Sequence, residues 1–117
     1  MKLIKIISKL SLEEKVSLLS GFDNWYTPNI KKHGIPKIKM SDGPNGVRGD
    51  SSTPQTSACF PSPILLGATW NEKLIKKIGS ATGEEALYKD VDVLLAPTIN
   101  LHRHPLGGRN FECYSCL

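Results

Sequence analysis

The sequence predicts an α/β fold with parallel strands, and the order of its apolar segments carries that prediction. Three short apolar stretches, residues 38–42, 60–68 and 91–97, have the composition of β-strands. A longer amphipathic stretch between the last two has the spacing of a helix. Strands and helices joined in this order by short connections are typical of a parallel sheet covered by helices, rather than of a sandwich or a bundle.

The first expected element is a helix from about Leu12 to Ser20. Ser11 and Glu14 form a capping box, in which the Ser11 hydroxyl accepts from the Glu14 amide and the Glu14 side chain reaches back to Ser11. The apolar residues that recur at helical spacing are Leu12, Val16 and Leu19. Gly21 supplies a C-terminal stop, so the helix is expected to end just before it.

A polar and aromatic loop, residues 22–26, follows this helix. Trp25 and Tyr26 allow two interpretations: their flat rings suit the apolar face of a sugar, but aromatic side chains in a loop also cap the edge of a core. Gly34 and Pro36 then turn the chain toward the next strand. His33, within this turn, is expected at the surface rather than as a ligand.

The strand over residues 38–42 ends at Asp42, which is the principal candidate for a functional residue. Apolar and polar residues alternate up to this point, and the Gly and Pro residues at 43, 44 and 46 prevent strand or helix from continuing. The carboxyl ends of strands hold ligands in α/β sheets and barrels. The alternative is plain turn chemistry, since Asp accepts hydrogen bonds from backbone amides two residues on.

The longest predicted element is a helix that begins after Asn71, whose side chain is a suitable cap. The apolar residues expected on one side of it are Leu74, Ile75, Ile78, Ala81 and Leu87. The charged residues expected elsewhere on it are Lys73, Lys76, Lys77, Glu84 and Glu85. Gly79 and Gly83 weaken the helix but are expected to permit close packing against a sheet. The strand over residues 91–97 is apolar enough to be buried on both faces.

A dense polar segment, Thr98–Glu112, follows that strand directly and again indicates a ligand face. His102 and His104 are two residues apart and would share a side of an extended segment. No Cys or carboxylate stands at a spacing that completes a metal site with them. The sequence therefore predicts no metal and no cofactor.

Composition and charge exclude several other classes of protein. The 117 residues are 39% hydrophobic and 22% charged, which is near the average for globular domains. The net charge of +4 comes from scattered lysines without a basic run, so a nucleic-acid partner is not expected. No apolar run approaches a membrane span. Lysines interrupt the N-terminal apolar stretch, so a secretory signal is not expected. The cysteine count of three is odd, which favours free thiols in a reducing cytoplasm.

Several motifs in order resemble the opening of a glycoside hydrolase family 3 β-glucosidase. They are Lys-His-Gly-Ile-Pro at 32–36, Met-Ser-Asp-Gly-Pro-Asn-Gly-Val-Arg at 40–48, Phe-Pro at 60–61, Ala-Thr-Trp at 68–70, Leu-Ala-Pro at 95–97 with Asn100, and Pro-Leu-Gly-Gly-Arg-Asn-Phe-Glu at 105–112. Separate motifs at consistent spacing are more specific than any one of them. The resemblance implies that residues 1–117 are an N-terminal fragment of a (β/α)₈ barrel domain, with its first strands and helices only.

The same resemblance assigns substrate-binding residues and a substrate class. It implies that Asp42 and Arg109 bind hydroxyls of the terminal sugar of a β-glucoside or related oligosaccharide, with Arg48 beside that pocket. Such a carboxylate only accepts hydrogen bonds and a guanidinium only donates them, so the pair suits the edge of a sugar. The family's nucleophile, acid/base and Lys-His pair lie farther along, so the resemblance places no catalytic residue in this chain.

The end of the sequence departs from the family pattern. Where the family continues with an acidic Glu-Asp-Pro, this chain reads Cys113-Tyr-Ser-Cys-Leu117, and we expect a truncation or a shifted reading frame. Cys113 and Cys116 form a C-x-x-C pair, which without a second ligand pair is a weak indication of redox or zinc chemistry. The predicted function is thus a fragment of a retaining glycosidase, inactive alone; the alternative is a non-catalytic remnant that binds carbohydrate or a partner.

Overall fold

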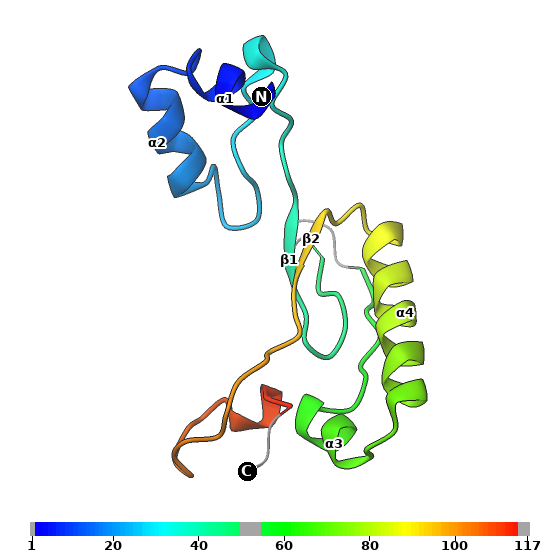
Figure 1. Ribbon diagram of the computed structural model, residues 1–117. Helices are drawn as coiled ribbons and strands as arrows, with labels where there is room; N and C mark the ends of the chain where they lie inside the picture. The colour runs from blue at the N-terminus through cyan, green and yellow to red at the C-terminus, as the bar shows by residue number, and fades with distance from the viewer. Residues whose placement is uncertain (1, 50–54, 115–117) are drawn as a thin grey trace. The chain divides into compact units, whose positions relative to one another are not determined.

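The computed structural model describes residues 2–49 and 55–114, and the chain divides into two units with the boundary between Met40 and Ser41. The first unit contains helices α1 and α2 and a 3₁₀ turn, η1. The second contains a pair of strands, β1 and β2, the helices α3 and α4, and a second 3₁₀ turn, η2 (Figure 1). Each unit has its own small set of buried apolar side chains, and each is described by itself below.

The first unit contains α1 (Lys2–Ile7), α2 (Leu12–Ser20) and η1 (Lys31–His33). The prediction for α2 is confirmed, including its cap: the Glu14 amide donates to Ser11 Oγ at 3.2 Å, and the Ser11 amide donates to the Glu14 carboxylate at 2.9 Å. Gly21 ends the helix with a φ of 76°, a left-handed value that favours glycine. Neither α1 nor η1 was predicted.

Glu14 also joins α2 to η1. Its carboxylate lies 2.8 Å from Lys32 Nζ and 3.5 Å from His33 Nε2. The hydrogen bond from Lys32, followed by the bond from the Ser11 amide, lowers the pKa of Glu14 below its ordinary value. The prediction that His33 is a surface residue is wrong, because its contact with Glu14 holds the side chain in a half-buried position.

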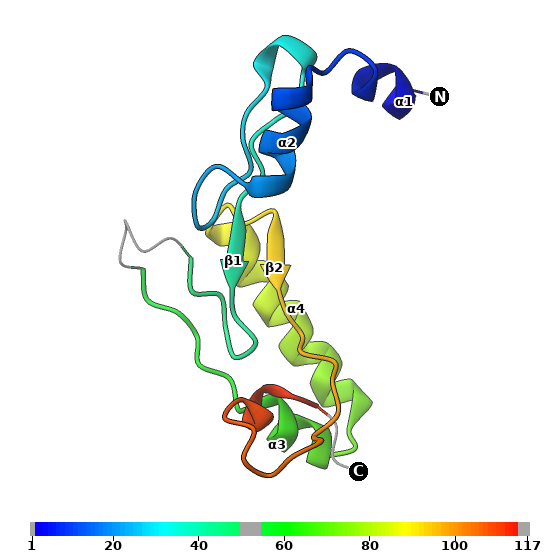
Figure 2. The same ribbon diagram turned by 90° about the vertical axis from the view of Figure 1, so that its left-hand side faces the viewer.

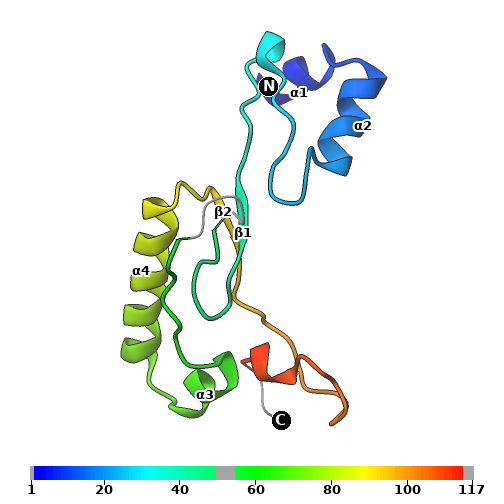
Figure 3. The same ribbon diagram turned by 180° about the vertical axis from the view of Figure 1, so that it is seen from behind.

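The second unit is built on β1 (Met40–Asp42) and β2 (Val93–Leu95), which pair in one two-stranded sheet. The two strands run parallel, and α4 (Glu72–Tyr88) lies alongside them (Figures 2 and 3). The helix begins at its predicted cap, where Asn71 Oδ1 accepts from the Leu74 amide at 3.1 Å. The α/β prediction is confirmed, although both strands are shorter than the stretches 38–42 and 91–97.

The prediction of a strand over residues 60–68 is wrong, since this stretch forms helix α3 (Pro63–Ala68). Pro63 occupies the first helical position, where its fixed φ suits a helix and its missing N–H would have no partner anyway. Pro63 and Leu66 are buried. Gly67 allows close approach, because a Cβ there would lie 2.7 Å from the Tyr114 carbonyl oxygen.

The prediction of one apolar side on α4 is only partly correct. Ile75 and Ile78 face the strands across a hollow, but Leu87 is 77% exposed. The expectation that Gly79 and Gly83 allow close packing is wrong within this chain. A Cβ at either glycine would meet no atom within 4 Å among the residues that the structure describes.

Glu85, expected on the outer side of α4, instead forms a largely buried ion pair with Lys89 at 2.9 Å. The Glu85 carboxylate accepts from the amides of Val47, at 3.0 Å, and Ala58, at 2.9 Å. Lys89 Nζ donates to the Val47 carbonyl and to Ser57 Oγ. We call Glu85 and Lys89 the α4 clamp, because together they bind the backbone N–H and the backbone carbonyl of Val47.

Electrostatics favour the ionised form of Glu85. Burial alone would raise the pKa of Glu85, but the hydrogen bond from Lys89 and those from the Val47 and Ala58 amides outweigh it, so the pKa lies below the usual 4.5. Lys89 has a side chain only 1% exposed, with the Val47 carbonyl, Ser57 and Glu85 around its amine. Removing one member would therefore leave a buried charge without its partner.

The prediction that the strand over residues 91–97 is buried on both faces is also wrong. Val93 and Leu95 are 42% and 51% exposed, because no further layer among the described residues covers that face of the two-stranded sheet. The exposure of Val93 and Leu95 is what a barrel fragment with only its first strands would show, since the strands that would cover them are absent from the fragment. None of the helices in the described ranges has the length and apolar character needed to cross a membrane.

We predict that Glu85→Gln destabilises the second unit by about 3–5 kcal/mol, the usual cost of breaking a buried ion pair. Urea unfolding followed by the circular dichroism of α4 would measure it, with Glu84→Gln, exposed on the same helix, as the control. Because folding lowers the pKa of Glu85, its stabilising contribution is complete above pH 4.5 and is lost as the pH falls through the folded value. Equal unfolding midpoints for the two variants at pH 7 would contradict the prediction.

We also predict that the 117-residue chain associates in solution, since exposed apolar strand residues and unpaired strand edges promote association. Light scattering over a tenfold range of concentration should show a mass that rises with concentration. Val93→Lys combined with Leu95→Lys should reduce that rise by placing charge on the exposed face. A monodisperse monomer with a sharp calorimetric transition would show that the unfinished sheet is tolerated and the prediction is wrong.

Candidate functional site

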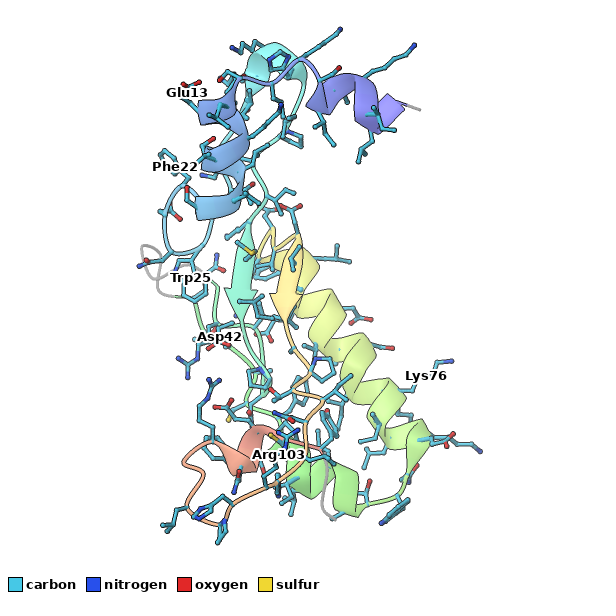
Figure 4. The ribbon with its side chains drawn as sticks, turned by 60° about the vertical axis from the view of Figure 1, so that its left-hand side comes forward. Glu13, Phe22, Trp25, Asp42, Lys76 and Arg103 are labelled. Carbon is cyan, nitrogen blue, oxygen red and sulfur yellow. The ribbon has the colours of Figure 1, made fainter. Side chains whose placement is uncertain are left out.

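Asp42 stands at the carboxyl end of β1, where a tight turn begins (Figure 4). The Arg48 amide donates to the Asp42 carbonyl at 3.0 Å and closes the turn. The buried Ser41 hydroxyl donates to the Asp42 carbonyl at 3.0 Å and accepts from the Gly49 amide at 2.9 Å. These bonds fix the backbone on both sides of the Asp42 side chain.

The glycines of the turn are required by close approach of backbone groups. A Cβ at Gly43 would lie 2.1 Å from the Gly46 carbonyl oxygen, and one at Gly46 would lie 1.9 Å from the Ala58 carbonyl oxygen. Asn45 adds two hydrogen bonds to Phe60. Its backbone carbonyl accepts from the Phe60 amide at 2.7 Å, and its side-chain nitrogen donates to the Phe60 backbone carbonyl at 3.2 Å. The turn is thus packed against the segment that follows it, while the Asp42 side chain at its start remains accessible to solvent.

The Asp42 carboxylate is accessible and has few partners within the chain. Arg48 Nε lies 4.0 Å from Asp42 Oδ2, at the limit of an ion pair, and the two side chains are 77% and 37% exposed. In the part of the chain that the structure describes, no closer donor reaches this carboxylate. Asp42 therefore keeps acceptor capacity for an external ligand.

Arg109, on the loop after β2, is the second charged group of the site. Its Nε and Nη2 atoms both donate to Glu112 Oε2, at 3.0 and 2.6 Å. These bonds and the charge of Glu112 raise the pKa of Arg109, and the charge of Asp42 acts in the same direction. This electrostatic coupling links the loop after β2 to the turn after β1, and we refer to Asp42, Arg48 and Arg109 as the charged cluster.

The loop that carries Arg109 is closed at its base. Thr98 and Cys113 form a parallel β-bridge, and the Tyr114 amide donates to the Thr98 carbonyl at 3.4 Å. Across the loop, the Asn110 side chain donates to the His104 carbonyl at 2.8 Å. The loop encloses an open hollow of about 410 Å³ whose wall includes Asn100, Arg109 and Glu112.

Comparison with known proteins establishes the family. The model for the glycosyl hydrolase family 3 N-terminal domain matches residues 4–116. The chain belongs to glycoside hydrolase family 3. It is 57% identical over 112 residues to a β-glucosidase of Rhizobium radiobacter and 52% identical over 111 residues to β-glucosidase B of Emericella nidulans. Each alignment covers 94% of this chain but only 14% and 13% of the relative.

Solved structures of family 3 enzymes have the same fold over this segment. The β-glucosidase of Kluyveromyces marxianus, in complex with glucose, superposes with a TM-score of 0.81 at 40% identity, over 91% of this chain and 13% of that one. β-Glucosidase 3B of Thermotoga neapolitana, also in complex with glucose, has a TM-score of 0.81 at 38% identity, over 98% of this chain and 19% of that one. The segment thus matches the N-terminal part of the family 3 barrel domain.

Within this family 3 segment, Arg48 Nε lies 4.0 Å from Asp42 Oδ2, and the charge of Asp42 helps to raise the pKa of Arg109. Asp42, Arg48 and Arg109 lie on the turn after β1 and the loop after β2. Their role in binding sugar stays a prediction. Trp25 and Tyr26 belong to the first unit, where the Tyr26 ring lies 3.4 Å from Lys37 Nζ. That cation–π contact favours a structural role for Tyr26.

The histidines and cysteines do not assemble a metal site among the described residues. His104 Nδ1 accepts from the Leu106 amide at 3.1 Å, and its neighbour His102 is half-buried on the same loop. Cys113 is buried beside the loop base, while Cys59 is exposed. Cys116, the other half of the C-x-x-C pair, lies outside the described residues.

Sequence reasoning missed the residues that position the site. Nothing in the sequence indicated that the Ser41 hydroxyl is buried. Nor did the sequence indicate that the Glu85–Lys89 pair is buried rather than on the surface. The available signal was the Glu85–Lys89 spacing of four at the end of an amphipathic helix, which allows an ion pair but does not reveal burial. The pairing of Arg109 with Glu112 was similarly visible only as a spacing of three.

Proposed function

We propose that this chain supplies the sugar-recognition part of a β-glucosidase active site, in which Asp42, Arg48 and Arg109 bind the terminal sugar of a β-glucoside. The accessible Asp42 carboxylate at the end of β1 carries this proposal, with Arg48 Nε 4.0 Å away and its charge acting on Arg109 from the loop after β2. The names of the relatives support the substrate class, since the Rhizobium radiobacter and Emericella nidulans proteins are β-glucosidases. Two related structures contain glucose.

The chemistry of the cluster suits a sugar edge. Neighbouring hydroxyls of a pyranose each carry one donor and free acceptor lone pairs. An open carboxylate takes hydrogen bonds from two such hydroxyls, and a guanidinium donates to the lone pairs of others. Arg109 is already oriented by two bonds from its Nε and Nη2 to Glu112, which lowers the entropy lost when its Nη1 engages a ligand.

Bond cleavage requires groups beyond this cluster. A retaining glycosidase uses two carboxyl groups about 5–5.5 Å apart, one as nucleophile and one as acid. The carboxylate of Glu112, on the loop after β2, is engaged by Arg109. We infer that the nucleophile and the acid come from polypeptide that corresponds to the rest of the relatives, of which this chain spans about 13–14%.

We predict that the 117-residue chain alone does not hydrolyse an aryl β-glucoside, because it binds sugar without the two groups that lower the barrier. Release of the aryl group should match that of the Asp42→Ala variant and of buffer. Turnover by the wild-type chain that disappears in Asp42→Ala would contradict the prediction. Glucose-dependent chemical-shift changes in the inactive chain, absent in Asp42→Ala, would show that the segment binds sugar by itself.

A chimera tests the role of Asp42 directly. The chain would replace the corresponding segment of the Rhizobium radiobacter β-glucosidase, to which it is 57% identical. Asp42→Asn keeps the size of the side chain but exchanges one acceptor oxygen for a donor. A hydrogen bond to a charged group contributes about 1.5–3 kcal/mol, so we expect kcat/KM on an aryl β-glucoside to fall at least tenfold.

Asp23→Asn in the same chimera is the control, since Asp23 uses its carboxylate to accept from the Trp25 and Tyr26 amides in the first unit. It should leave kcat/KM within about twofold, because an amide oxygen can accept the same bonds. An active chimera in which Asp42→Asn keeps wild-type kcat/KM would show that Asp42 is only a turn residue. The sugar-recognition proposal would then be wrong.

A further inference from the structure

The peptide group between Val47 and Arg48 is hydrogen-bonded at both of its polar atoms. Its carbonyl, which belongs to Val47, accepts from Lys89 Nζ and also from Ser57 Oγ, the latter at 2.7 Å. Its N–H, which belongs to Arg48, donates to the Asp42 carbonyl at 3.0 Å. Because a peptide group is planar and rigid, this one joins the end of α4 to the turn that carries the accessible Asp42 carboxylate.

The Lys89 side chain is built into this junction. It is 1% exposed, and its amine also donates to Ser57 Oγ at 2.7 Å and to the Glu85 carboxylate at 2.9 Å. Its methylene stem packs against Gly49, where a Cβ would lie 3.5 Å from Lys89 Cδ. Moving the amine away from the Val47 carbonyl would break this set of bonds and leave a buried charge without its partners.

Asp42 and Arg48 depend on this peptide group to different degrees. Asp42 is the last residue of β1 and is held by the pairing of the strands, whereas Arg48 lies beyond the strand and belongs to no helix or strand. The Arg48 side chain is 77% exposed, with its Nε 4.0 Å from Asp42 Oδ2. Little packing therefore orients this side chain, and the direction in which it leaves the backbone is set by the Val47–Arg48 peptide group.

We propose that Lys89 is a positioning residue for sugar recognition, because with Ser57 it holds the Val47 carbonyl and so fixes the peptide group from which the Arg48 side chain extends. The inference rests on the proposed function, since it takes Arg48 as a group that binds the sugar. It adds that a buried side chain on α4, which does not touch the sugar, determines how tightly the sugar is held. Preorganised donors lose less entropy on binding, so loosening this peptide group weakens binding although every sugar-binding group is still present.

A role of Lys89 in stability alone leads to different kinetics. Partial unfolding lowers the concentration of active enzyme and therefore the apparent kcat, but the molecules that stay folded keep their KM and their inhibition constant for glucose. A loosened Arg48 raises both constants in the folded molecules themselves. The inhibition constant for glucose therefore separates a positioning role from a purely structural one.

The experiment uses the chimera with the Rhizobium radiobacter β-glucosidase, an aryl β-glucoside as substrate and glucose as competitive inhibitor. Lys89→Met removes the amine and keeps an unbranched apolar stem. Lys77→Met makes the same exchange at an exposed position on α4 and is the control. We expect Lys89→Met to raise KM and the inhibition constant for glucose by about tenfold, and Lys77→Met to leave both within about twofold, because only Lys89 is bonded to the turn.

Ser57→Ala is the milder variant and carries the test if Lys89→Met does not fold. It removes one donor to the Val47 carbonyl and one acceptor for Lys89, at an exposed position. We expect it to raise the inhibition constant for glucose about threefold, with Ser80→Ala, exposed on α4, as its control. In an Arg48→Ala background the effect of Ser57→Ala should disappear, because two changes that act through the same group are not additive.

Unchanged KM and inhibition constants in folded Lys89→Met and in Ser57→Ala, beside weakened glucose binding in Arg48→Ala, would overturn this inference and leave the proposed function intact. Additive effects of Ser57→Ala and Arg48→Ala would overturn it as well, since Lys89 and Ser57 would then not act through Arg48. Wild-type constants in Arg48→Ala would contradict the proposed role of Arg48 in binding sugar, and this inference would fall with it.

Discussion

The backbone of Val47 is the point on which the second unit depends. Its N–H donates to Glu85 and its carbonyl accepts from Lys89, so the C-terminal end of α4 holds the two peptide groups that flank the Val47 Cα. Ser57 and Ala58 bind the same two side chains, which fastens the segment before α3 to the same place. A helix, a turn and a connecting segment thus share one buried ion pair.

This anchoring explains how an exposed carboxylate can keep a fixed position. Asp42 is open to solvent, but its backbone is tied to Arg48, and Arg48 directly follows the clamped Val47. On the other strand, the loop of Arg109 is closed by the bridge between Thr98 and Cys113. Preorganised polar groups bind a ligand with less loss of conformational entropy than groups on free loops. The rigid parts are buried, and the charged tips remain available.

The sequence predicted what local rules determine and missed what tertiary contacts determine. The cap at Ser11, the cap at Asn71 and the strand ending at Asp42 are local features, and all three are present. The stretch 60–68 was misassigned because the apolar run after its two prolines has the length of a strand, while proline at the first position of a helix was the stronger signal. Burial of Lys89 could not be predicted, because its partners are 32 and 42 residues away. Asp42 was indicated by its place at the end of a predicted strand, whereas Arg48 and Arg109 came from motif resemblance.

Burial of the Lys89 amine also has a consequence for covalent chemistry. An amine reacts with an acylating reagent through its deprotonated lone pair, and it must be exposed to meet the reagent. Lys73, Lys76 and Lys77 on the same helix are exposed, whereas Lys89 has three hydrogen-bond acceptors around a side chain that is 1% exposed. Acylation of Lys89 therefore requires the end of α4 to separate from Val47, so its rate of modification reports how often the second unit opens.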